Sequence, residues 1–403
     1  MLSDMNNLTI NPLRVQTILI IIICIMGAGL IWSGCNYYLE NTNLQSDLVL
    51  VADNNTVSES TIGYQRADGT IALNFPNDYG PHPDYQTEWW YYTGNLETPE
   101  GRHFGYQLTF FRRALLPPIQ RLTRSSNWSV EQVYMAHFAL TDTASNQHHA
   151  YERLARGSAG IAGAQAEPYK VWLQDWRVEE TGPDTYKLVA SQDEITLSLT
   201  LNDLKGPVLH GVDGYSQKGP DPGNASYYYS QTRLDTEGIL SINDKTYTVA
   251  GLSWKDHEYS TSALSEGQVG WDWFSIQLSD YSELMVFQLR REDGSIDHFS
   301  SGTLIDADGN LMHLGNLDFE IEVQDRWKST QTGATYPIRW LLRVPKAGIQ
   351  LELTPYIQDQ EMKVSYIYWE GAVYVNGQKD NQPVTGNGYV ELSGYAGSLS
   401  GEF

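Results

Sequence analysis

The feature of this sequence that most restricts its fold is a strand pattern that runs almost without interruption from Ile62 onward. Nearly every segment alternates apolar and polar residues or carries β-branched and aromatic side chains. Turn signals separate these segments, among them Pro99-Glu100-Gly101, Asn243-Asp244, Asp293-Gly294, Asp308-Gly309 and Asn376-Gly377. A period of two residues between short polar turns is typical of antiparallel strands. We therefore predict an all-β fold.

Two hairpin-like units with the same layout predict two similar domains in tandem. Each unit joins a Trp-rich strand to a strand that ends in Arg-Arg, first around residues 87–113 and again around residues 269–291. A repeat separated by about half the chain is typical of related domains, although two hairpins can also look alike by chance. We place the boundary before the strand that begins near Ile239. The predicted domains are residues 62–237 and 238–403.

The first 35 residues predict export or membrane anchoring. Residues 17–32 form an apolar run, and Arg14 is the only cation before it. A positive charge on that side favours a cytoplasmic N-terminus with the rest of the chain beyond the membrane. The run leads into Ser33-Gly34-Cys35, which resembles the lipobox of bacterial lipoproteins, so lipidation is predicted at Cys35. A retained transmembrane anchor and plain secretion are the alternatives.

Residues 36–61 are polar and rich in turn formers, which predicts a flexible tether between the membrane and the fold. The folded part is therefore expected in the bacterial cell envelope, outside the cytoplasm. Since the chain's two cysteines are Cys24 and Cys35, the folded part is expected to have no disulfide.

Charge and aromatic content restrict the partners. The net charge of −23 would repel a phosphate backbone, so nucleic acid is not an expected partner. The 12 Trp and 26 Tyr residues favour strands and offer flat surfaces to apolar ligands. The sequence also lacks a Gly-x-Ser-x-Gly elbow, a phosphate-binding loop and a His-Glu-x-x-His motif. Asp306 to Asn310 is expected to form a hairpin turn rather than a calcium loop, and we predict no metal site and no cofactor.

Residues 252–291 set acidic side chains among aromatic ones, which predicts a pocket for an apolar ligand. Alternation from residue 271 to 278 puts Asp272 on one face with Phe274, Ile276 and Leu278. If that face lines a barrel interior, desolvation raises the pKa of Asp272 and makes it a proton donor. The alternative is an ion pair with Arg290.

A second acid lies in the preceding strand, where alternation puts Asp256 on the face of Trp254 and Glu258. His257 shares the opposite face with Lys255 and Tyr259. His257 could relay a proton or activate water, because its ordinary pKa is close to neutral, or it could simply hydrogen-bond a neighbouring strand.

Glu88 before Trp89-Trp90 and Glu370 after Trp369 repeat the pattern of an acid beside Trp, with strand-end ion pairs as the alternative. The residues predicted to bind the ligand are Trp254, Tyr259, Trp271, Trp273, Trp90 and Glu88.

These residues belong to six ordered blocks in which the chain resembles the AttH/CrtC-type lipocalin-like family. Its named members include carotenoid 1,2-hydratase and predicted secreted hydrolases. The blocks are HPDYQTEWWYYTGNL (82–96), GYQLTFFRR (105–113), GPDPGNASYYYS (219–230), LSWKDHEYSTSAL (252–264), GWDWFSIQL (270–278), and YWEGAVYVNG with GNGYVELSGY (368–395). The resemblance implies two tandem lipocalin-like (calycin) antiparallel β-barrels. It also implies a link to lipid or isoprenoid metabolism, or to ABC-type transporters.

The calycin pattern pairs an early Trp with a late Arg through a structural cation–π contact. The pairs that the resemblance implies are Trp90 with Arg112 or Arg113, and Trp273 with Arg290 or Arg291.

The hydratase branch of the family adds water to a carbon–carbon double bond by acid catalysis. His257 in Asp-His-Glu-Tyr resembles that branch's Asp-His-x-aromatic block, with Tyr259 in place of Trp. The catalytic acid corresponds to Asp256 or Asp272. The chain departs from the branch at Phe287-Gln288, where a Tyr and an acid are expected, and this weakens the assignment of hydratase chemistry.

We therefore expect a membrane-tethered, lipocalin-like protein that binds a long apolar ligand, with carotenoid 1,2-hydratase-like addition of water as its chemistry. The alternative is a non-catalytic lipoprotein accessory that contacts an ABC-type transporter permease. A hydrolase is less favoured, because no nucleophile–base motif is present.

Overall fold

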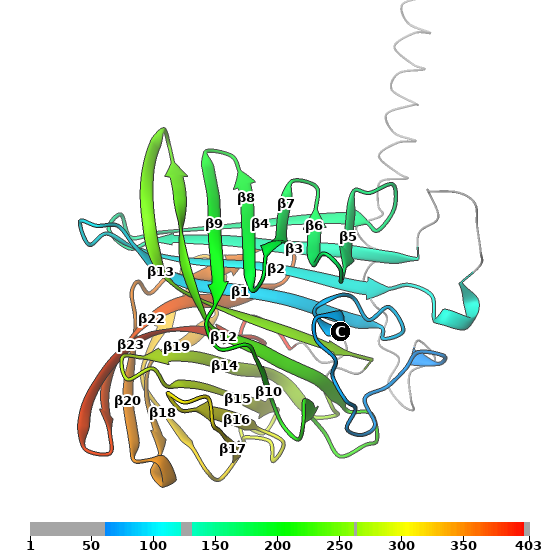
Figure 1. Cartoon of the computed structure of the whole chain (residues 1–403). Coiled ribbons are helices and arrows are strands. Elements are labelled where there is room, and N and C mark those ends of the chain that lie inside the picture. The colour runs from blue at the N-terminus through cyan, green and yellow to red at the C-terminus, as the bar shows by residue number, and fades with distance from the viewer. Residues whose placement is uncertain (1–60, 122–130, 262–263, 399–403) are drawn as a thin grey trace, which may run out of the picture. The chain divides into compact units, whose positions relative to one another are not determined.

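The computed structural model describes residues 61–121, 131–261 and 264–398. The predicted membrane segment, its lipidation site Cys35 and the tether up to residue 60 lie outside these residues. Within them, no helix has the length and apolar character needed to cross a membrane. The predicted all-β fold is confirmed, since strands in two antiparallel sheets make up the architecture (Figure 1).

The first sheet is built from the N-terminal part of the fold. Its strand order is β4 (Gln147–Arg156), β3 (Gln132–Asp142), β2 (His103–Ala114), β1 (Thr87–Glu97), β13 (Lys245–Ser260), β12 (Ala225–Ile242), β9 (Ile195–Asp203), β8 (Thr185–Gln192), β7 (Trp176–Gly182), β6 (Lys170–Leu173) and β5 (Ala162–Gln165). The short strands β10 (Pro207–Leu209) and β11 (Tyr215–Gln217) pair with β12.

The second sheet is built from the C-terminal part. Its strand order is β17 (Leu311–Gly315), β16 (Ser301–Ile305), β15 (Glu283–Arg291), β14 (Gln268–Leu278), β23 (Gln382–Leu392), β22 (Ile367–Lys379), β20 (Ile349–Pro355), β19 (Thr335–Val344) and β18 (Glu320–Lys328), with β21 (Glu361–Lys363) paired to β22. Three 3-10 turns complete the described elements, namely η3 (Asn77–Tyr79), η4 (Pro118–Gln120) and η5 (Pro345–Ala347). Both sheets are barrel-like, one nearly closed and the other a half-barrel.

The change from one sheet to the other comes after β13. The hairpin β12–β13 belongs to the first sheet, and β13 joins it to β1 in an antiparallel pair. The second sheet begins only at Gln268. The boundary drawn between residues 237 and 238 falls inside β12, because this strand continues from residue 225 to residue 242 and pairs with β13 on both sides of that point.

The two Trp-rich units are hairpins as predicted, β1–β2 and β14–β15. The Asn376-Gly377 turn prediction is wrong, because both residues lie within β22. The chain reverses instead at Asp380-Asn381, where both residues have positive φ. Gly377 is needed inside the strand, because a side chain there would collide with the backbone of Gln350 on β20.

The predicted Trp–Arg contacts do not occur among the described residues. Arg112 instead pairs with Glu88 on the same face of the sheet, 2.8 Å from Nε to Oε2, because a buried carboxylate attracts a guanidinium more strongly than an indole does. Trp273 and Arg290 lie on opposite faces of the β14–β15 hairpin, and Arg290 stacks on Tyr395 instead.

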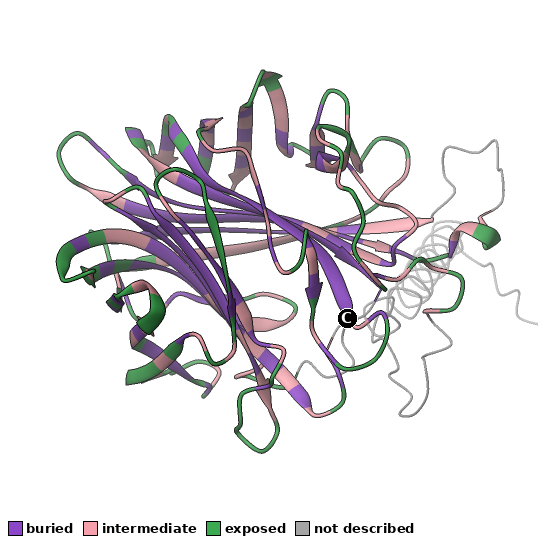
Figure 2. Ribbon diagram, turned by 60° about the horizontal axis from the view of Figure 1, so that its bottom comes forward, coloured by how far each residue is buried: buried purple, intermediate pink, exposed green. Residues whose placement is uncertain are grey.

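Each sheet has its own apolar core, and a third apolar cluster lies between the sheets. In the first core, Trp90 and Tyr92 of β1 are fully buried; in the second, Phe274 and Trp340 are. The third cluster joins Tyr91 and Trp254 of the first sheet to Trp273 of the second. The strands in the middle of the molecule are therefore buried on both faces (Figure 2).

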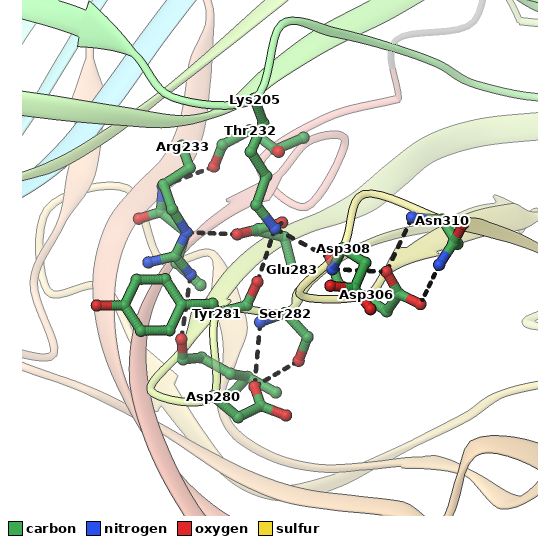
Figure 3. A network of polar contacts seen from close by, with 12 residues as sticks. Lys205, Thr232, Arg233, Asp280, Tyr281, Ser282, Glu283, Asp306, Asp308 and Asn310 are labelled. Carbon is green, nitrogen blue, oxygen red and sulfur yellow. Dashed lines mark hydrogen bonds and ion pairs between the residues drawn. The ribbon is translucent and has the colours of Figure 1, made fainter.

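A cluster of buried ion pairs joins the two sheets (Figure 3). Glu283 of β15 is fully buried and pairs with Arg233 of β12 and with Lys205, whose Nζ lies 2.8 Å from Oε2. Lys205 also donates to the carbonyl oxygens of Tyr281 and Asp306. As predicted, Asp306 begins a turn, and its carboxylate accepts the backbone N–H groups of residues 308 and 310.

We predict that Glu283→Gln lowers the free energy of unfolding by about 3 kcal/mol, because it leaves two cations buried without their anion. Urea unfolding of the two proteins measures this difference. The control is Glu352→Gln, which removes the exposed partner of Arg339 and is expected to cost less than about 1 kcal/mol. Equal losses in both variants would contradict the role assigned to Glu283.

Candidate functional site

An inter-sheet cavity of about 140 Å³ lies between the outer faces of the two sheets. Strands β1, β2, β12 and β13 form one wall, and β14, β15, β22 and β23 form the other. Its aromatic lining includes Trp89, Tyr91, Phe111, Tyr228, Trp271, Trp273, Phe287 and Tyr368. Aromatic surface of this kind favours an apolar ligand. The predicted pocket therefore lies between the two sheets rather than inside either barrel.

Strand alternation decides which side chains reach the cavity. In β1, Trp89 and Tyr91 face it, whereas Glu88 and Trp90 face the first sheet's own core. In β13, Asp256 and Glu258 line the cavity, and His257 between them points the other way. The faces predicted for β13 are thus correct, and they separate Asp256 from His257.

Asp256 is a buried carboxyl with three hydrogen-bond donors around it. Its Oδ1 accepts from Trp254 Nε1 at 2.6 Å and from the hydroxyl of Ser230, and its Oδ2 accepts from the Tyr228 hydroxyl at 2.7 Å. Burial raises the pKa of Asp256 to about 7, although these hydrogen bonds oppose the rise. Trp273 of the other wall donates a hydrogen bond from Nε1 to the Tyr228 hydroxyl at 3.0 Å, so a chain of hydrogen bonds connects both walls of the cavity to Asp256.

Two further acids face each other on the opposite wall. Glu370 of β22 and Glu391 of β23 are direct cross-strand partners, and both line the cavity. Trp271 Nε1 donates to Glu391 at 2.8 Å, and burial raises the pKa of Glu391 to about 7. Burial, together with the charge of Glu391, also raises the pKa of Glu370 well above its ordinary value.

The contacts of Glu370 determine where its proton lies. The Tyr91 hydroxyl donates to Oε1 at 2.6 Å, so that oxygen is an acceptor. The other oxygen, Oε2, is buried and has no hydrogen-bond partner among the described residues. A neutral Glu370 therefore carries its proton on Oε2.

The charges around the cavity are strongly unbalanced. Four carboxyl groups line it, those of Asp256, Glu258, Glu370 and Glu391, whereas Lys218 is the one Lys or Arg among its described lining residues. Lys218 lies 3.3 Å from Glu258 and above the ring of Phe287. Burial in this apolar, cation-poor setting accordingly raises the pKa values of Asp256, Glu370 and Glu391 above their ordinary values.

Several residues predicted for the site lie elsewhere. Asp272 shares a face with Phe274 as predicted, and burial raises its pKa. Its partners, however, are Arg290 at 2.9 Å and the Tyr395 hydroxyl, which matches the ion-pair alternative. It does not line the cavity.

The core side of the first sheet holds four other predicted residues, His257, Tyr259, Trp90 and Glu88. Trp254 is buried beside the cavity and holds Asp256.

Sequence reasoning missed Glu391 as a site residue and treated Glu370 as a strand-end acid. In the segment YVELSGY, Glu391 alternates with Val390 and Leu392, which is the pattern of a strand whose polar face is exposed to water. The two sheets cover that face, and only the tertiary structure shows this. The repeated pairing of an acid with Trp is the signal that could have identified Glu370.

A family model described as AttH-like matches residues 66–395. A crystal structure of a putative AttH from Nitrosomonas europaea is 34% identical, with a TM-score of 0.74, over 82% of this chain and 99% of that chain. No curated protein matches.

Two more distant structures share the fold. Kievitone hydratase from Nectria haematococca is 16% identical with a TM-score of 0.61, over 83% of this chain and 99% of that chain. CghA with Sch210972 is 12% identical with a TM-score of 0.52, over 87% and 99%.

The raised pKa of Glu391 predicts how stability depends on pH. Because its folded-state pKa of about 7 exceeds its ordinary value of 4.5, the folded protein binds more protons than the unfolded chain between these values. This group's contribution to stability is therefore lost as the pH rises from about 4.5 to about 7.

We predict that Glu391→Gln removes this loss. The free energy of unfolding of the variant, measured relative to that of the wild type, should therefore increase by up to about 3 kcal/mol between pH 4 and pH 8. Urea unfolding at both pH values tests the prediction, with the exposed Glu352→Gln as control. Parallel pH profiles for wild type and Glu391→Gln would show that Glu391 is ionised normally.

Proposed function

This chain belongs to the AttH-like family, and we propose that it binds a long apolar lipid or isoprenoid ligand in the inter-sheet cavity and adds water to a carbon–carbon double bond of that ligand. One observation carries this proposal. Glu370 is a fully buried acid in an aromatic cavity, and its Oε2 has no hydrogen-bond partner among the residues that the structure describes.

The first step is transfer of the Glu370 proton to the alkene. The π electrons of the double bond form the new C–H bond, the O–H bond of Glu370 breaks, and a carbocation results. Trp89, Trp271, Trp273 and Phe287 offer aromatic faces to that cation, and the Glu370 carboxylate left behind is its counter-ion.

The second step is capture of the cation by water. Asp256, on the opposite wall and in its carboxylate form, hydrogen-bonds the water and takes one of its protons as the C–O bond forms. The product is an alcohol. Proton transfer through solvent from Asp256 back to Glu370 restores the starting state, so the reaction consumes only alkene and water.

Two considerations support the proposal. Kievitone hydratase has the same fold, and its name assigns it the addition of water. A water-insoluble ligand also suits the expected tether, since a folded part held in the cell envelope would meet its ligand at the membrane surface.

We predict that Glu370→Gln lowers turnover at least about 100-fold, because an amide cannot supply the proton. The test incubates the full-length chain in mild detergent with an acyclic carotenoid such as lycopene and with a lipid extract. Mass spectrometry then looks for an 18-dalton gain. Glu352→Gln serves as the control and should match the wild type. Full activity in Glu370→Gln would exclude Glu370 as the proton donor.

A second prediction tests binding separately from chemistry. Leu264 lines the cavity and is half-buried, so Leu264→Trp is expected to fill part of the space without disrupting the fold. Retention of apolar ligand during purification, measured by mass spectrometry of an organic extract, should fall several-fold. If folded wild-type protein retains no apolar compound and adds no water, both halves of the proposal fail.

A further inference from the structure

On the core side of the first sheet, away from the inter-sheet cavity, His82, Glu88 and His257 converge. Nδ1 of His82 lies 2.9 Å from Glu88 Oε1, and Nε2 of His257 lies 2.8 Å from the same oxygen. The three atoms all lie within 4.8 Å of one another. Glu88 and His257 are fully buried, and His82, in the loop before β1, is partly exposed.

The proton of His82 is fixed by Asp78. Nε2 of His82 lies 2.8 Å from the carboxylate oxygen Oδ1 of Asp78, which can only accept, so Nε2 carries a hydrogen. A neutral imidazole has one N–H. Nδ1 of a neutral His82 therefore directs a lone pair at Glu88.

The proton of His257 is fixed by Tyr229. The Tyr229 hydroxyl donates its single hydrogen to the backbone oxygen of Asp78 at 2.9 Å. It also lies 2.6 Å from Nδ1 of His257, and as long as the hydroxyl hydrogen points at Asp78 the imidazole is the donor in that contact. A neutral His257 consequently directs the lone pair of Nε2 at the same oxygen of Glu88.

With these tautomers, two imidazole lone pairs point at a carboxylate whose hydrogen-bond donors are the backbone N–H of His82 and Arg112, and this arrangement favours added positive charge between the three groups. We propose that His82, Glu88 and His257 bind a divalent transition-metal ion, for which Zn²⁺ is the best match. Two imidazole nitrogens and one carboxylate oxygen form a common ligand set for such ions.

The surroundings of the three ligands fit this assignment. Asp78 orients His82, Tyr229 orients His257, and Arg112 holds the second oxygen of Glu88. Metal-binding histidines in proteins generally have such a partner on the other ring nitrogen. Tetrahedral bonds of about 2.0–2.1 Å place ligand atoms about 3.3 Å apart, so Glu88 and each imidazole, now 2.9 and 2.8 Å apart, need to separate by only about half an ångström to admit the ion.

The ion would join the loop at His82 to β1 and β13. It would therefore stabilise this part of the first sheet, with its remaining coordination position open to water. The other source of positive charge is an extra proton on His82, whose two ring nitrogens both face carboxylates, and the experiment distinguishes the two.

The test uses the full-length chain in mild detergent, stripped with a chelator, incubated with Zn²⁺ and dialysed. Mass spectrometry of the metal content should give about one Zn²⁺ per chain, and Zn²⁺ should raise the midpoint of thermal unfolding. His82→Gln should bind at least about 100-fold more weakly, and Asp78→Asn about 10- to 100-fold more weakly. His103→Gln, which alters a histidine outside the cluster, should bind as the wild type does.

A folded wild-type protein that retains no Zn²⁺ and shows an unchanged midpoint would overturn the proposal. Undiminished binding by His82→Gln would overturn it equally. If the variants fail to fold, Co²⁺ bound to the wild type decides, because ligation by the cluster gives visible absorption bands and adventitious binding does not. Since these residues do not line the cavity, Glu370→Gln should retain its Zn²⁺, so failure here is independent of the proposed hydration.

Discussion

The structure depends on strands that are buried on both faces. In β1 and β13 one face packs into the core of the first sheet, and the other forms a wall of the inter-sheet cavity. A strand with one solvent-exposed face can keep its acidic side chains hydrated on that face. Here Glu88 and Asp256, on opposite faces, both lose their water and need partners inside the protein.

The two faces meet that need in different ways. On the core side, the charge of Arg112 and the backbone N–H of His82 keep Glu88 ionised, and its pKa lies below the ordinary value although burial opposes this. On the cavity side, Glu370 and Glu391 face each other with few cations nearby, and burial raises the pKa of both groups, which favours the protonated form. The first sheet thus lies between the ionised Glu88 on its core side and the acids with raised pKa values, Glu370 and Glu391, on its cavity side.

Much of this arrangement can be predicted from the sequence, because alternation is a local property. It gives the β-fold, the hairpins β1–β2 and β14–β15, the opposite directions of Asp256 and His257, and the apolar neighbours of Asp272. The alternation of residues along a strand does not show which other element packs against either of its faces. Glu391 therefore looks like an exposed residue in the sequence, and the pairing of Asp272 with Arg290 competes on equal terms with a catalytic role until the fold is known.

The central claim is that Glu370 is a neutral acid at pH 7. Difference infrared spectra of the wild type and Glu370→Gln in full-length protein test it directly, because a protonated carboxyl and a carboxylate absorb at different frequencies. We expect the variant to lose a protonated-carboxyl band at pH 7. Loss of a carboxylate band instead would show that Glu370 is ionised and cannot be the proton donor.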